Sequence, residues 1–376
     1  MDRYDIPFMQ RALDLARKGS GLASPNPMVG CVIVRDGELV GEGFHQYDRR
    51  DHAETAALKV AGDRARGATL YVNLEPCCHT GRTGPCVQAI VAAGIRRVNA
   101  AMPDPNPAVA GKGFDVLRSS GIEVDNGTLQ DEAQRLNEAF AFWIRARRPF
   151  VTLKSALTLD GQLALPASGK KKSSTWFTSE ESRAEVHRMR HSSDALLTGI
   201  GTVLADDPAL TDRSGLPRRR PLLRVLLDSR LRLSPRSRVV QAAARDLLVF
   251  TCVKGNSQRR KQLERAGVEV VSLRGRPGRV PLQPVLEELG KRDILSVLLE
   301  AGPSLNGAAL AAGVVHKVSL FLAPKLAGGS AVPFASAPGL AIPQLTGIRM
   351  RHFGPDLALE GYLRHVYGNH RASRHN

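Results

Sequence analysis

The sequence His52-Ala53-Glu54, followed by Pro76-Cys77-Cys78-His79-Thr80-Gly81-Arg82-Thr83-Gly84-Pro85-Cys86, supplies two imidazoles, three thiols and a carboxylate. Three protein ligands of this kind fill only part of a tetrahedral zinc shell, so a fourth position stays open for water. Bound zinc lowers the pKa of that water to about 7, which makes hydroxide available at neutral pH. Glu54 follows the histidine closely enough to carry protons between hydroxide, substrate and a departing amine. The order His-x-Glu, then Pro-Cys and a further Cys, is typical of zinc-dependent deaminases.

The expected ligand set is His52, Cys77 and Cys86. Cys77 occupies the Pro-Cys position and is preferred to its neighbour Cys78 as a ligand. Cys86 is predicted to lie in the first turn of a helix, whose N-terminus favours a thiolate.

A closed structural zinc site is the main alternative interpretation of this motif. Such a site needs a fourth Cys or His at short spacing, and His79 could be that ligand. The protein would then be a zinc-stabilised binding module without catalysis. Disulfides are not expected, because the sequence carries no sign of export to an oxidising compartment. Cys31 and Cys252 lie in apolar, strand-like runs and are expected to be buried and unreactive.

Length and composition indicate a globular protein of two domains. The chain has 376 residues, 43% of them hydrophobic, which is enough for two separate cores. Its N-terminus carries acids and lacks the apolar core of a signal peptide. No apolar run approaches the roughly 20 residues of a membrane span. We therefore expect a cytoplasmic protein with no membrane partner.

The net charge of +17 raises the question of a nucleic-acid partner. Residues 1–146 contain 17 basic and 18 acidic side chains, whereas residues 147–376 contain 36 and 18. The zinc motif therefore lies in a nearly neutral half, and a deaminase that grips a polyphosphate should itself carry the positive field. We expect the basic clusters at 170–172, 218–220 and 259–261 to be solvated loops and helix faces. The alternative, an RNA-editing deaminase with a basic RNA-binding half, predicts steeply salt-dependent RNA binding.

The first half alternates between helical and strand-like periodicity. The predicted elements are a helix near 8–16, strands at 29–34 and 39–43 around the turn Asp36-Gly37, a helix opening at His52, strands at 69–74 and 97–102, and a long helix at about 131–145. This order predicts a three-layer α/β/α domain with both metal-binding segments at helix starts, facing one cleft.

The segment 145–149 interrupts this pattern and marks the predicted boundary between a domain at 1–146 and one at 147–368, with a basic tail at 369–376. The second half predicts strands at 150–156, 195–198, 224–227, 247–251, 268–272, 295–300 and 317–322, and helices at 179–190, 258–266, 282–289 and 304–311. No Gly-x-Gly-x-x-Gly is present, so a Rossmann site is not supported. Gly199–Thr202 and Glu300–Ser304 link strands to helices, either as phosphate-binding turns or as ordinary connections.

Both halves resemble one known family. Eight residues separate Cys77 from Cys86, and this loop, with Ser24–Gly30, Gly41–His45 and Asp104–Pro107, resembles the pyrimidine deaminase of riboflavin biosynthesis over residues 1–146. The segments Lys154–Gly161, Thr202–Thr211 and Glu300–Pro303 resemble the reductase of the same pathway. The chain is thus identified as a member of the bifunctional riboflavin-biosynthesis deaminase/reductase family. The resemblance implies a cytidine-deaminase-like domain followed by a dihydrofolate-reductase-like α/β domain that uses NADPH.

The resemblance also implies roles for residues at matching positions. The zinc ligands would be His52, Cys77 and Cys86, with Glu54 as the proton shuttle. The deaminase substrate site would be lined by Asn26, His45, Arg82, Asp104 and Asn106. Substrate contacts in the reductase would be Ser174, Arg190, Leu210, Arg213 and Glu300. NADPH contacts would be Ala156, Trp176, Thr202, Asp206, Ser229, Gly302, Pro303, Ser304, Leu305, Asn306, Gly307 and Ala308.

Two consecutive reactions follow from the resemblance. The first is zinc-hydroxide deamination of 2,5-diamino-6-ribosylamino-4(3H)-pyrimidinone 5′-phosphate, with Glu54 protonating the ring and the leaving ammonia. The second is NADPH reduction of the ribosyl group to ribityl. Arg190 and Arg213 would suit a phosphate clamp, because guanidinium groups bind phosphate oxygens in pairs. The partners implied are phosphorylated pyrimidines and further copies of the chain, as a homo-oligomer.

Overall fold

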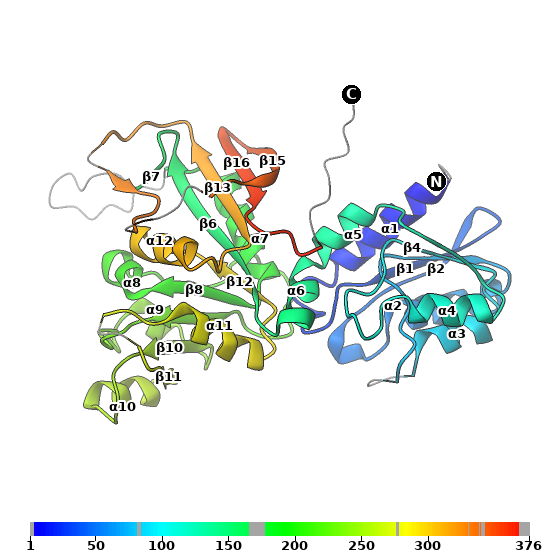
Figure 1. Cartoon of the computed structure of the whole chain (residues 1–376), viewed down its shortest axis with the longest axis horizontal. Coiled ribbons are helices and arrows are strands. Elements are labelled where there is room, and N and C mark those ends of the chain that lie inside the picture. Colours follow the sequence, from blue (N-terminus) through cyan, green and yellow to red (C-terminus); the bar gives the residue numbers. More distant parts are fainter. Residues whose placement is uncertain are drawn as a thin grey trace. The chain divides into compact units, whose positions relative to one another are not determined.

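The computed structural model describes residues 4–80, 84–164, 177–275, 278–329, 331–337, 339 and 343–367. The chain forms two compact units, each with its own sheet (Figure 1). Unit 1 comprises Met1–Arg147 with Pro217–Arg220, and unit 2 comprises Arg148–Leu216 with Pro221–Asn376. Both units mix helices and strands, which confirms the predicted α/β class. In the described part of the chain, no helix combines the length and apolarity that a membrane crossing requires.

Unit 1 is built on a five-stranded sheet of order β2-β1-β3-β4-β5. The strands are β1 Gly30–Arg35, β2 Glu38–Phe44, β3 Thr69–Val72, β4 Arg97–Ala100 and β5 Glu123–Asn126. The helices are α1 Asp5–Arg17, α2 Ala53–Ala61, α3 Cys86–Ala92, α4 Lys112–Ser119, α5 Gln130–Leu136 and α6 Glu138–Ala146. Helices α2, α3 and α4 lie on one side of the sheet and α1 and α5 on the other (Figure 1). The predicted three-layer domain is therefore confirmed.

Close packing of α2 on the sheet explains how the metal-binding motif reaches its position. The hairpin of β1 and β2 turns at Asp36 and Gly37, whose φ angles of 51° and 82° suit a tight two-residue turn. A Cβ on Gly43 would lie 2.7 Å from the Ala53 carbonyl oxygen, so only glycine lets α2 approach β2 this closely. The start of α2, with His52 and Glu54, is thereby held against the sheet.

The long helix predicted at 131–145 is wrong, because the chain breaks there into α5 and α6. Asn137 lies between the two helices with φ −110° and ψ 19°, and its side chain is 2% exposed. Its Oδ1 accepts the Met28 N–H at 2.8 Å, and its Nδ2 donates to the Met28 carbonyl at 2.9 Å. An amide side chain that bonds the backbone of another segment ends a helix in this way. The sequence pattern also missed α4 and β5.

Unit 2 contains a nine-stranded sheet of order β11-β10-β9-β8-β12-β6-β13-β16-β15, in which neighbouring strands are parallel except that β16 is antiparallel to both β13 and β15. The strands are β6 Phe150–Thr158, β8 Ala195–Gly199, β9 Leu223–Leu227, β10 Leu247–Thr251, β11 Glu269–Ser272, β12 Ser296–Leu299, β13 Lys317–Ala323, β15 Thr346–Phe353 and β16 Asp356–Tyr362. A small second sheet pairs β7 Gln162–Ala164 with β14 Val332–Pro333. The helices are α7 Glu180–Ser192, α8 Ile200–Asp206, α9 Arg238–Gln241, α10 Gln258–Arg265, α11 Leu282–Lys291 and α12 Pro303–Ala311.

All seven strands predicted for the second half are confirmed, as are its four helices. The side chains of successive strand residues point to opposite faces of the sheet and therefore pack in two different hydrophobic cores. Leu196 and Leu298 pack on one face with residues of α8, α9 and α10, whereas Leu197 and Leu299 pack on the other with residues of α11 and α12. Helix α8 begins at Ile200, in the segment that was expected to link a strand to a helix, whereas α9 and the hairpin of β15 and β16 were not predicted.

Two expectations about surface and core need correction. Cys31 is buried as predicted, but Cys252 is partly exposed, because it follows β10 instead of lying within it. Arg219 was expected in a solvated loop, yet it belongs to unit 1, where its guanidinium lies 3.8 Å from the Tyr47 ring centroid and its Nε donates to Asp48 at 2.9 Å. The cluster at 170–172 lies outside the described residues.

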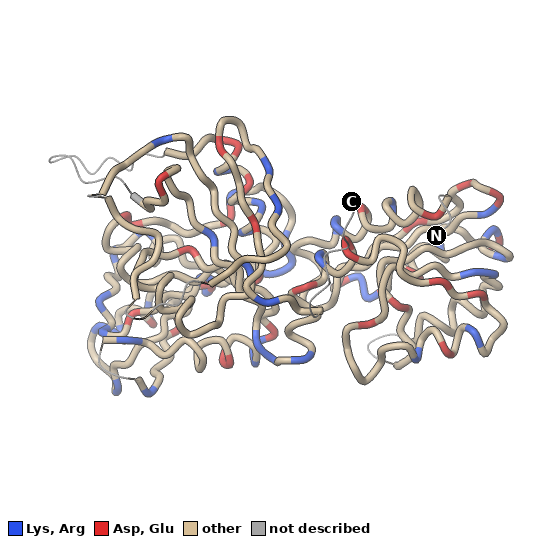
Figure 2. The backbone as a smooth tube through the Cα atoms, turned by 45° about the horizontal axis from the view of Figure 1, so that its top comes forward, with Lys and Arg blue, Asp and Glu red and all other residues tan. Residues whose placement is uncertain are grey.

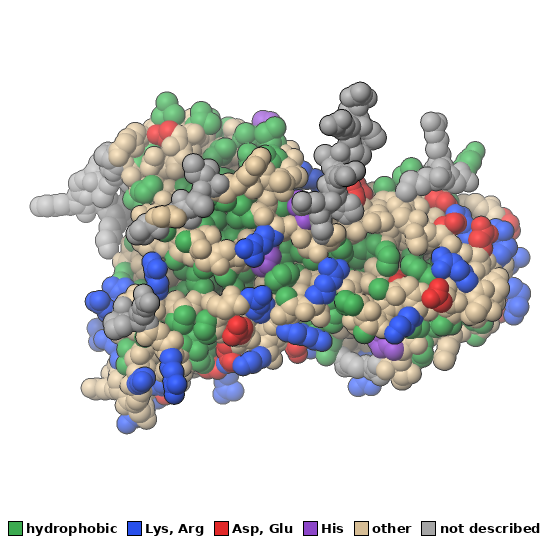
Figure 3. Space-filling view, in the orientation of Figure 1, with side chains coloured by type: hydrophobic (Ala, Val, Ile, Leu, Met, Phe, Trp, Pro, Cys, Tyr) green, Lys and Arg blue, Asp and Glu red, His purple; other side chains and the backbone are tan. Residues whose placement is uncertain are grey.

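Basic side chains occur in both units and on many elements (Figure 2). On the face drawn in Figure 3 they are interspersed with hydrophobic, polar and acidic side chains. Arg260, from the cluster at 259–261, is used locally, with bonds to Glu264 and to the Val270 carbonyl. Such local pairing fits the expected helix face better than a nucleic-acid surface.

Candidate active sites

The structure brings His52, Cys77 and Cys86 together in unit 1. His52 is the N-cap of α2, Cys86 is the first residue of α3, and Cys77 lies in the loop that follows β3. The His52 Nδ1 lies 3.1 Å from the Cys86 Sγ and 3.4 Å from the Cys77 Sγ. All three ligand atoms lie within 4.8 Å of one another. One imidazole and two thiols at this separation match the donor set of a catalytic zinc site with an open position.

The two thiols share protons unequally. A hydrogen bond from Cys86 lowers the pKa of Cys77 most, and His52 lowers it further. The same contact raises the pKa of Cys86, and burial adds to this effect. The bond to Cys77 also raises the pKa of His52. Cys77 is therefore the first of the two to become a thiolate, which is the form that binds a metal.

Glu54 lies beside this cluster, in the first turn of α2. Its side chain is 4% exposed. Burial, and then the negative charge of Cys77, raise the pKa of Glu54 to about 7. A carboxyl group with a pKa near neutrality can both accept and release a proton, as a general acid–base catalyst must.

His79 and Cys78 lie outside the cluster. Among the described residues, the group that could hold a metal contains only His52, Cys77 and Cys86, and the exposed His79 is not part of it. Cys78 is partly exposed. A closed four-ligand site with His79 therefore finds no support here.

Residues expected to line the deaminase substrate site fall into two groups. Asn26 Nδ2 lies 3.0 Å from His45 Nε2, and the His45 ring meets the His52 ring edge-on at 5.4 Å. Asp104 and Asn106 lie in the loop after β4, where the Asp104 Oδ1 accepts the Asn106 N–H at 2.8 Å. Burial raises the pKa of Asp104 to about 6. Arg82 lies outside the described residues.

Glu75 connects the cysteine loop to the loop after β4, and it was not singled out from the sequence. Its carboxylate is 3% exposed and accepts four backbone N–H groups. These bonds are Asp104 and Gly111 to Oε2, both at 2.9 Å, and Gly113 at 2.8 Å and Phe114 at 3.3 Å to Oε1. A Cβ on Gly113 would lie 2.2 Å from the Pro76 carbonyl oxygen, so the first turn of α4 packs directly against the cysteine loop. Its position directly before Pro76-Cys77 was the only signal available.

In unit 2, the expected cofactor residues gather at the carboxyl ends of neighbouring parallel strands. Ala156 lies in β6, Thr202 in the first turn of α8 after β8, Ser229 after β9, and Gly302 at the N-cap of α12 after β12. Ligands of open α/β sheets bind at this edge. Beyond the adjacent residues and the helix backbone, no atom of the described residues lies within 4 Å of the position that a Cβ would occupy on Gly201 or Gly302. Both helix starts therefore offer space and backbone amides for the phosphates of a dinucleotide such as NADPH.

The remaining expected cofactor residues have different exposures. Asp206 is exposed at the end of α8, and Ser304 is exposed in the first turn of α12. The α12 residues Pro303, Leu305 and Ala308 are partly buried, whereas Asn306 and Gly307 are buried. Trp176 and the substrate residue Ser174 lie outside the described residues.

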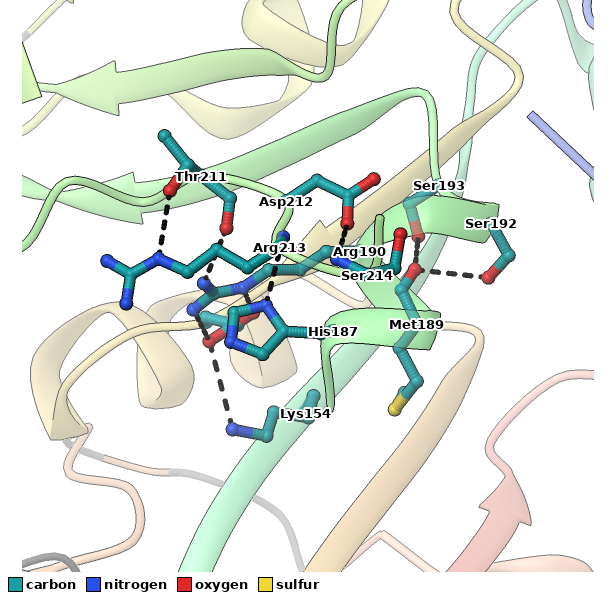
Figure 4. Close-up of polar contacts among 11 residues, drawn as sticks. Lys154, His187, Met189, Arg190, Ser192, Ser193, Thr211, Asp212, Arg213 and Ser214 are labelled. Atoms are coloured by element: carbon teal, nitrogen blue, oxygen red, sulfur yellow. Dashed lines mark hydrogen bonds and ion pairs between the residues drawn. The ribbon is translucent and has the colours of Figure 1, made fainter. Parts of the chain in front are cut away.

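A buried ion-pair cluster lies at the same edge of the sheet (Figure 4). The Nε and Nη2 of Arg190 donate to the two oxygens of Glu300 at 2.7 and 2.9 Å, and the Nζ of Lys154 lies 3.7 Å from Glu300 Oε2. Burial opposes ionisation of Glu300, but Arg190 and Lys154 outweigh it and lower its pKa to about 2. Burial lowers the pKa of Lys154. Lys154 was not assigned a role from the sequence, although a lysine on a mostly buried strand is a signal.

The loop that follows α8 carries the other two expected substrate residues. Leu210 has φ +57° and a buried side chain, so its backbone is the part that faces outward. Arg213 is exposed. Arg190 already donates three hydrogen bonds, two to Glu300 and one to the Thr211 carbonyl. The phosphate clamp by Arg190 and Arg213 remains a prediction, and Arg213 is the more accessible of the two.

Comparison with known proteins identifies both units. Residues 3–102 match the model of the cytidine and deoxycytidylate deaminase zinc-binding region, and residues 149–359 match that of the RibD C-terminal domain. Together with the two sites, these matches define a two-domain enzyme that joins a zinc-dependent deaminase to a reductase.

Similarity extends over nearly the whole chain. It is 43% identical to the riboflavin biosynthesis protein RibD of Escherichia coli, over 94% of this chain and 98% of that protein. A solved structure of Acinetobacter baumannii RibD has a TM-score of 0.82 and 38% identity, covering 96% of this chain and 99% of that one. A Thermotoga maritima deaminase/reductase has a TM-score of 0.82 and 35% identity with the same coverage. The chain belongs to the RibD family, whose members are bifunctional deaminase/reductases of riboflavin biosynthesis that use zinc and NADPH.

Proposed function

We propose that this chain deaminates 2,5-diamino-6-ribosylamino-4(3H)-pyrimidinone 5′-phosphate and then reduces the ribosyl group of the product to ribityl. The Thermotoga maritima relative is described as a diaminohydroxyphosphoribosylaminopyrimidine deaminase and 5-amino-6-(5-phosphoribosylamino)uracil reductase. We assign the deaminase to residues 1–146 and the reductase to 147–368, with 369–376 as a tail. The single observation that carries the proposal is the His52, Cys77 and Cys86 cluster with buried Glu54 beside it.

In the deaminase, His52, Cys77 and Cys86 would hold zinc. Zinc in a three-ligand site supplies an activated water at neutral pH. Glu54 would take a proton from that water and pass it to a pyrimidine ring nitrogen. It would then move the proton of the newly added hydroxyl group to the amino group, which leaves as ammonia. A Glu54 pKa of about 7 suits proton transfer in both directions. Asn26, His45, Arg82, Asp104 and Asn106 would orient the pyrimidine.

In the reductase, NADPH supplies the hydride to the ribosyl C1′ carbon. The cofactor would lie along the strand ends at Ala156, Trp176, Thr202, Asp206, Ser229 and 302–308. Lys154 holds a proton at Nζ for the sugar oxygen that is freed as the ring opens. Glu300 and Arg190 fix the position of Lys154, and Ser174, Leu210 and Arg213 would bind the rest of the substrate.

The test follows ammonia release and NADPH oxidation in one reaction with the purified zinc-loaded protein. We expect ammonia from the diaminopyrimidine substrate without NADPH, and NADPH oxidation once the cofactor is added. Neither signal from folded, zinc-containing protein would overturn the substrate assignment. Tight, salt-dependent RNA binding by that protein would then favour the RNA-editing alternative.

We further propose that the protein forms a homo-oligomer in the cytoplasm. Edge strand β15 is exposed over nearly its full length, and its Ile348 and Met350 are 54% and 66% exposed. Apolar side chains on an unpaired edge strand favour contact with another chain. A pair of zinc-binding thiols requires a reducing compartment. Light scattering after size-exclusion chromatography gives the mass, and an entirely monomeric protein would contradict the oligomer.

A further inference from the structure

Helix α7 holds the loop after α8 through three side chains on one face. His187, Arg190 and His191 each bond one of three consecutive loop residues. The contacts are Arg190 Nη1 to the Thr211 carbonyl at 3.1 Å, His191 Nδ1 to Asp212 Oδ2 at 3.2 Å, and the Arg213 N–H to His187 Nδ1 at 3.3 Å. Figure 4 shows the loop residues lying against the helix at this point. The path of Thr211–Arg213 is therefore dictated by α7.

The bond to Arg213 fixes the protonation state of His187. A backbone N–H can only donate, so Nδ1 must be the unprotonated acceptor and the ring must be neutral. Burial, and then the positive charges of Arg190 and Arg213, lower the pKa of His187. Glu300 and Asp212 act in the opposite direction but are outweighed. The surroundings thus keep the ring in the form that the bond requires.

Arg190 and Arg213 are not equivalent partners for a phosphate. Arg190 is already bound to both oxygens of Glu300 and to the Thr211 carbonyl. Arg213 is exposed, and its side chain makes one bond to the residues that the structure describes, from Nε to Thr211 Oγ1 at 3.3 Å. Its two Nη groups therefore remain for an anion. Where that guanidinium points depends on its backbone, which His187 holds.

We propose that His187 is a positioning residue of the reductase, which orients Arg213 toward the 5′-phosphate of the substrate. His187 touches neither the reacting carbon nor the hydride; it acts through Arg213. The inference rests on the proposed reductase activity and adds to it a residue that determines affinity for the phosphorylated substrate.

Three substitutions separate this role from a general structural one. His187→Ala removes the acceptor, whereas His187→Asn places an amide oxygen where Nδ1 was. Arg188→Ala is the matched control, because Arg188 is exposed on the same helix and, within the described part of the chain, pairs only with Glu185. Deamination by the same molecules reports that the chain is intact. If His187→Ala does not fold, His187→Gln replaces it, since its oxygen falls nearer the Nε2 position.

Two quantities are measured for each variant: the Kd of the deaminated, phosphorylated substrate without NADPH, by calorimetry, and the KM and kcat of reduction. We expect His187→Ala to raise Kd and KM about tenfold with little change in kcat, the size of one lost hydrogen bond to an anion-binding group. His187→Asn should recover most of this loss. In an Arg213→Ala background, His187→Ala should have no further effect.

Unchanged Kd in His187→Ala would overturn the proposal. So would an equal loss in the Arg213→Ala background, which would show that His187 acts elsewhere, or a fall in kcat alone, which would indicate a part in hydride transfer. A wild-type protein that binds the substrate but does not oxidise NADPH is a different result. It would overturn the proposed reductase activity itself, and the positioning role with it.

Discussion

Replacing His316 by asparagine should make unit 2 less sensitive to acid. His316 precedes β13, is 6% exposed, and accepts the Val151 N–H on Nδ1 at 3.0 Å. Its ring stacks on Phe150 with centroids 4.9 Å apart. Burial lowers its pKa most, the charges of Arg364 and Arg148 lower it further, and the result is a value of about 4 instead of 6.5. His316 must therefore stay neutral while the protein is folded.

The direction of the effect follows from comparing the folded and unfolded chains. Because the folded pKa lies below the unfolded one, the unfolded chain takes up the proton first as the pH falls. The stabilisation by neutral His316 is complete above pH 6.5 and is lost as the pH falls toward 4. The difference between the two pKa values corresponds to about 3 kcal/mol in total. Of this, about 2 kcal/mol should disappear between pH 7.5 and pH 5.

The assay is urea denaturation at pH 7.5 and pH 5, with hydrogen exchange of peptides from β6 and β13 to report on unit 2. Asparagine keeps an acceptor for the Val151 N–H but does not titrate, so His316→Asn should lose about 2 kcal/mol less than wild type over this interval. The control is His352→Asn, which removes an exposed histidine from edge strand β15. Equal losses in wild type and His316→Asn would refute the reasoning, whatever the absolute stabilities.

Three further predictions concern the carboxylates of the two sites. Glu54→Gln should abolish ammonia release while zinc content and NADPH oxidation with deaminated substrate persist; residual deamination would contradict the proton-transfer role. Glu75→Gln should lower the kcat/KM of deamination at least about tenfold with zinc still bound, because an amide NH2 would face backbone donors; loss of zinc instead would point to a purely structural role. Glu300→Gln should stop reduction, spare deamination and destabilise unit 2 by about 3 kcal/mol, since two buried cations lose their partner; a fully active reductase would contradict this.

The residues of the zinc cluster were predictable because a short local motif marks each of them. His52 and Cys86 each lie at the start of a helix. The residues that predict each helix start are the immediate sequence neighbours of the ligand. The hairpin turn at Asp36-Gly37 was predictable for the same reason. The sequence pattern could not show how far these starts lie from one another, because that distance depends on how α2 and α3 pack on the sheet.

Glu75, Lys154 and His187 were missed because their partners are distant in sequence. Glu75 bonds a backbone N–H 38 residues away, Lys154 pairs with Glu300, and His187 accepts a bond from Arg213, 26 residues away. The break at Asn137 depends on the Met28 backbone, 109 residues away. Strand β15 was also missed, although Ile348-Arg349-Met350-Arg351 alternates between apolar and basic residues as a half-buried strand does. In the structure, the strand is exposed over nearly its whole length.

The two units use the same chemical group for opposite purposes, and the neighbours of each carboxylate decide which. Glu54 and Glu300 are both shielded from water, which by itself raises the pKa of a carboxyl group. Glu54 lies beside Cys77, whose negative charge adds to that effect, so its pKa reaches about 7 and protons can pass through it. Glu300 lies between Arg190 and Lys154, which hold its pKa at about 2, so it remains a fixed anion that orders two cations. The first arrangement suits deamination, which moves several protons, and the second suits a site where the cofactor carries the hydride and the protein must hold the substrate still.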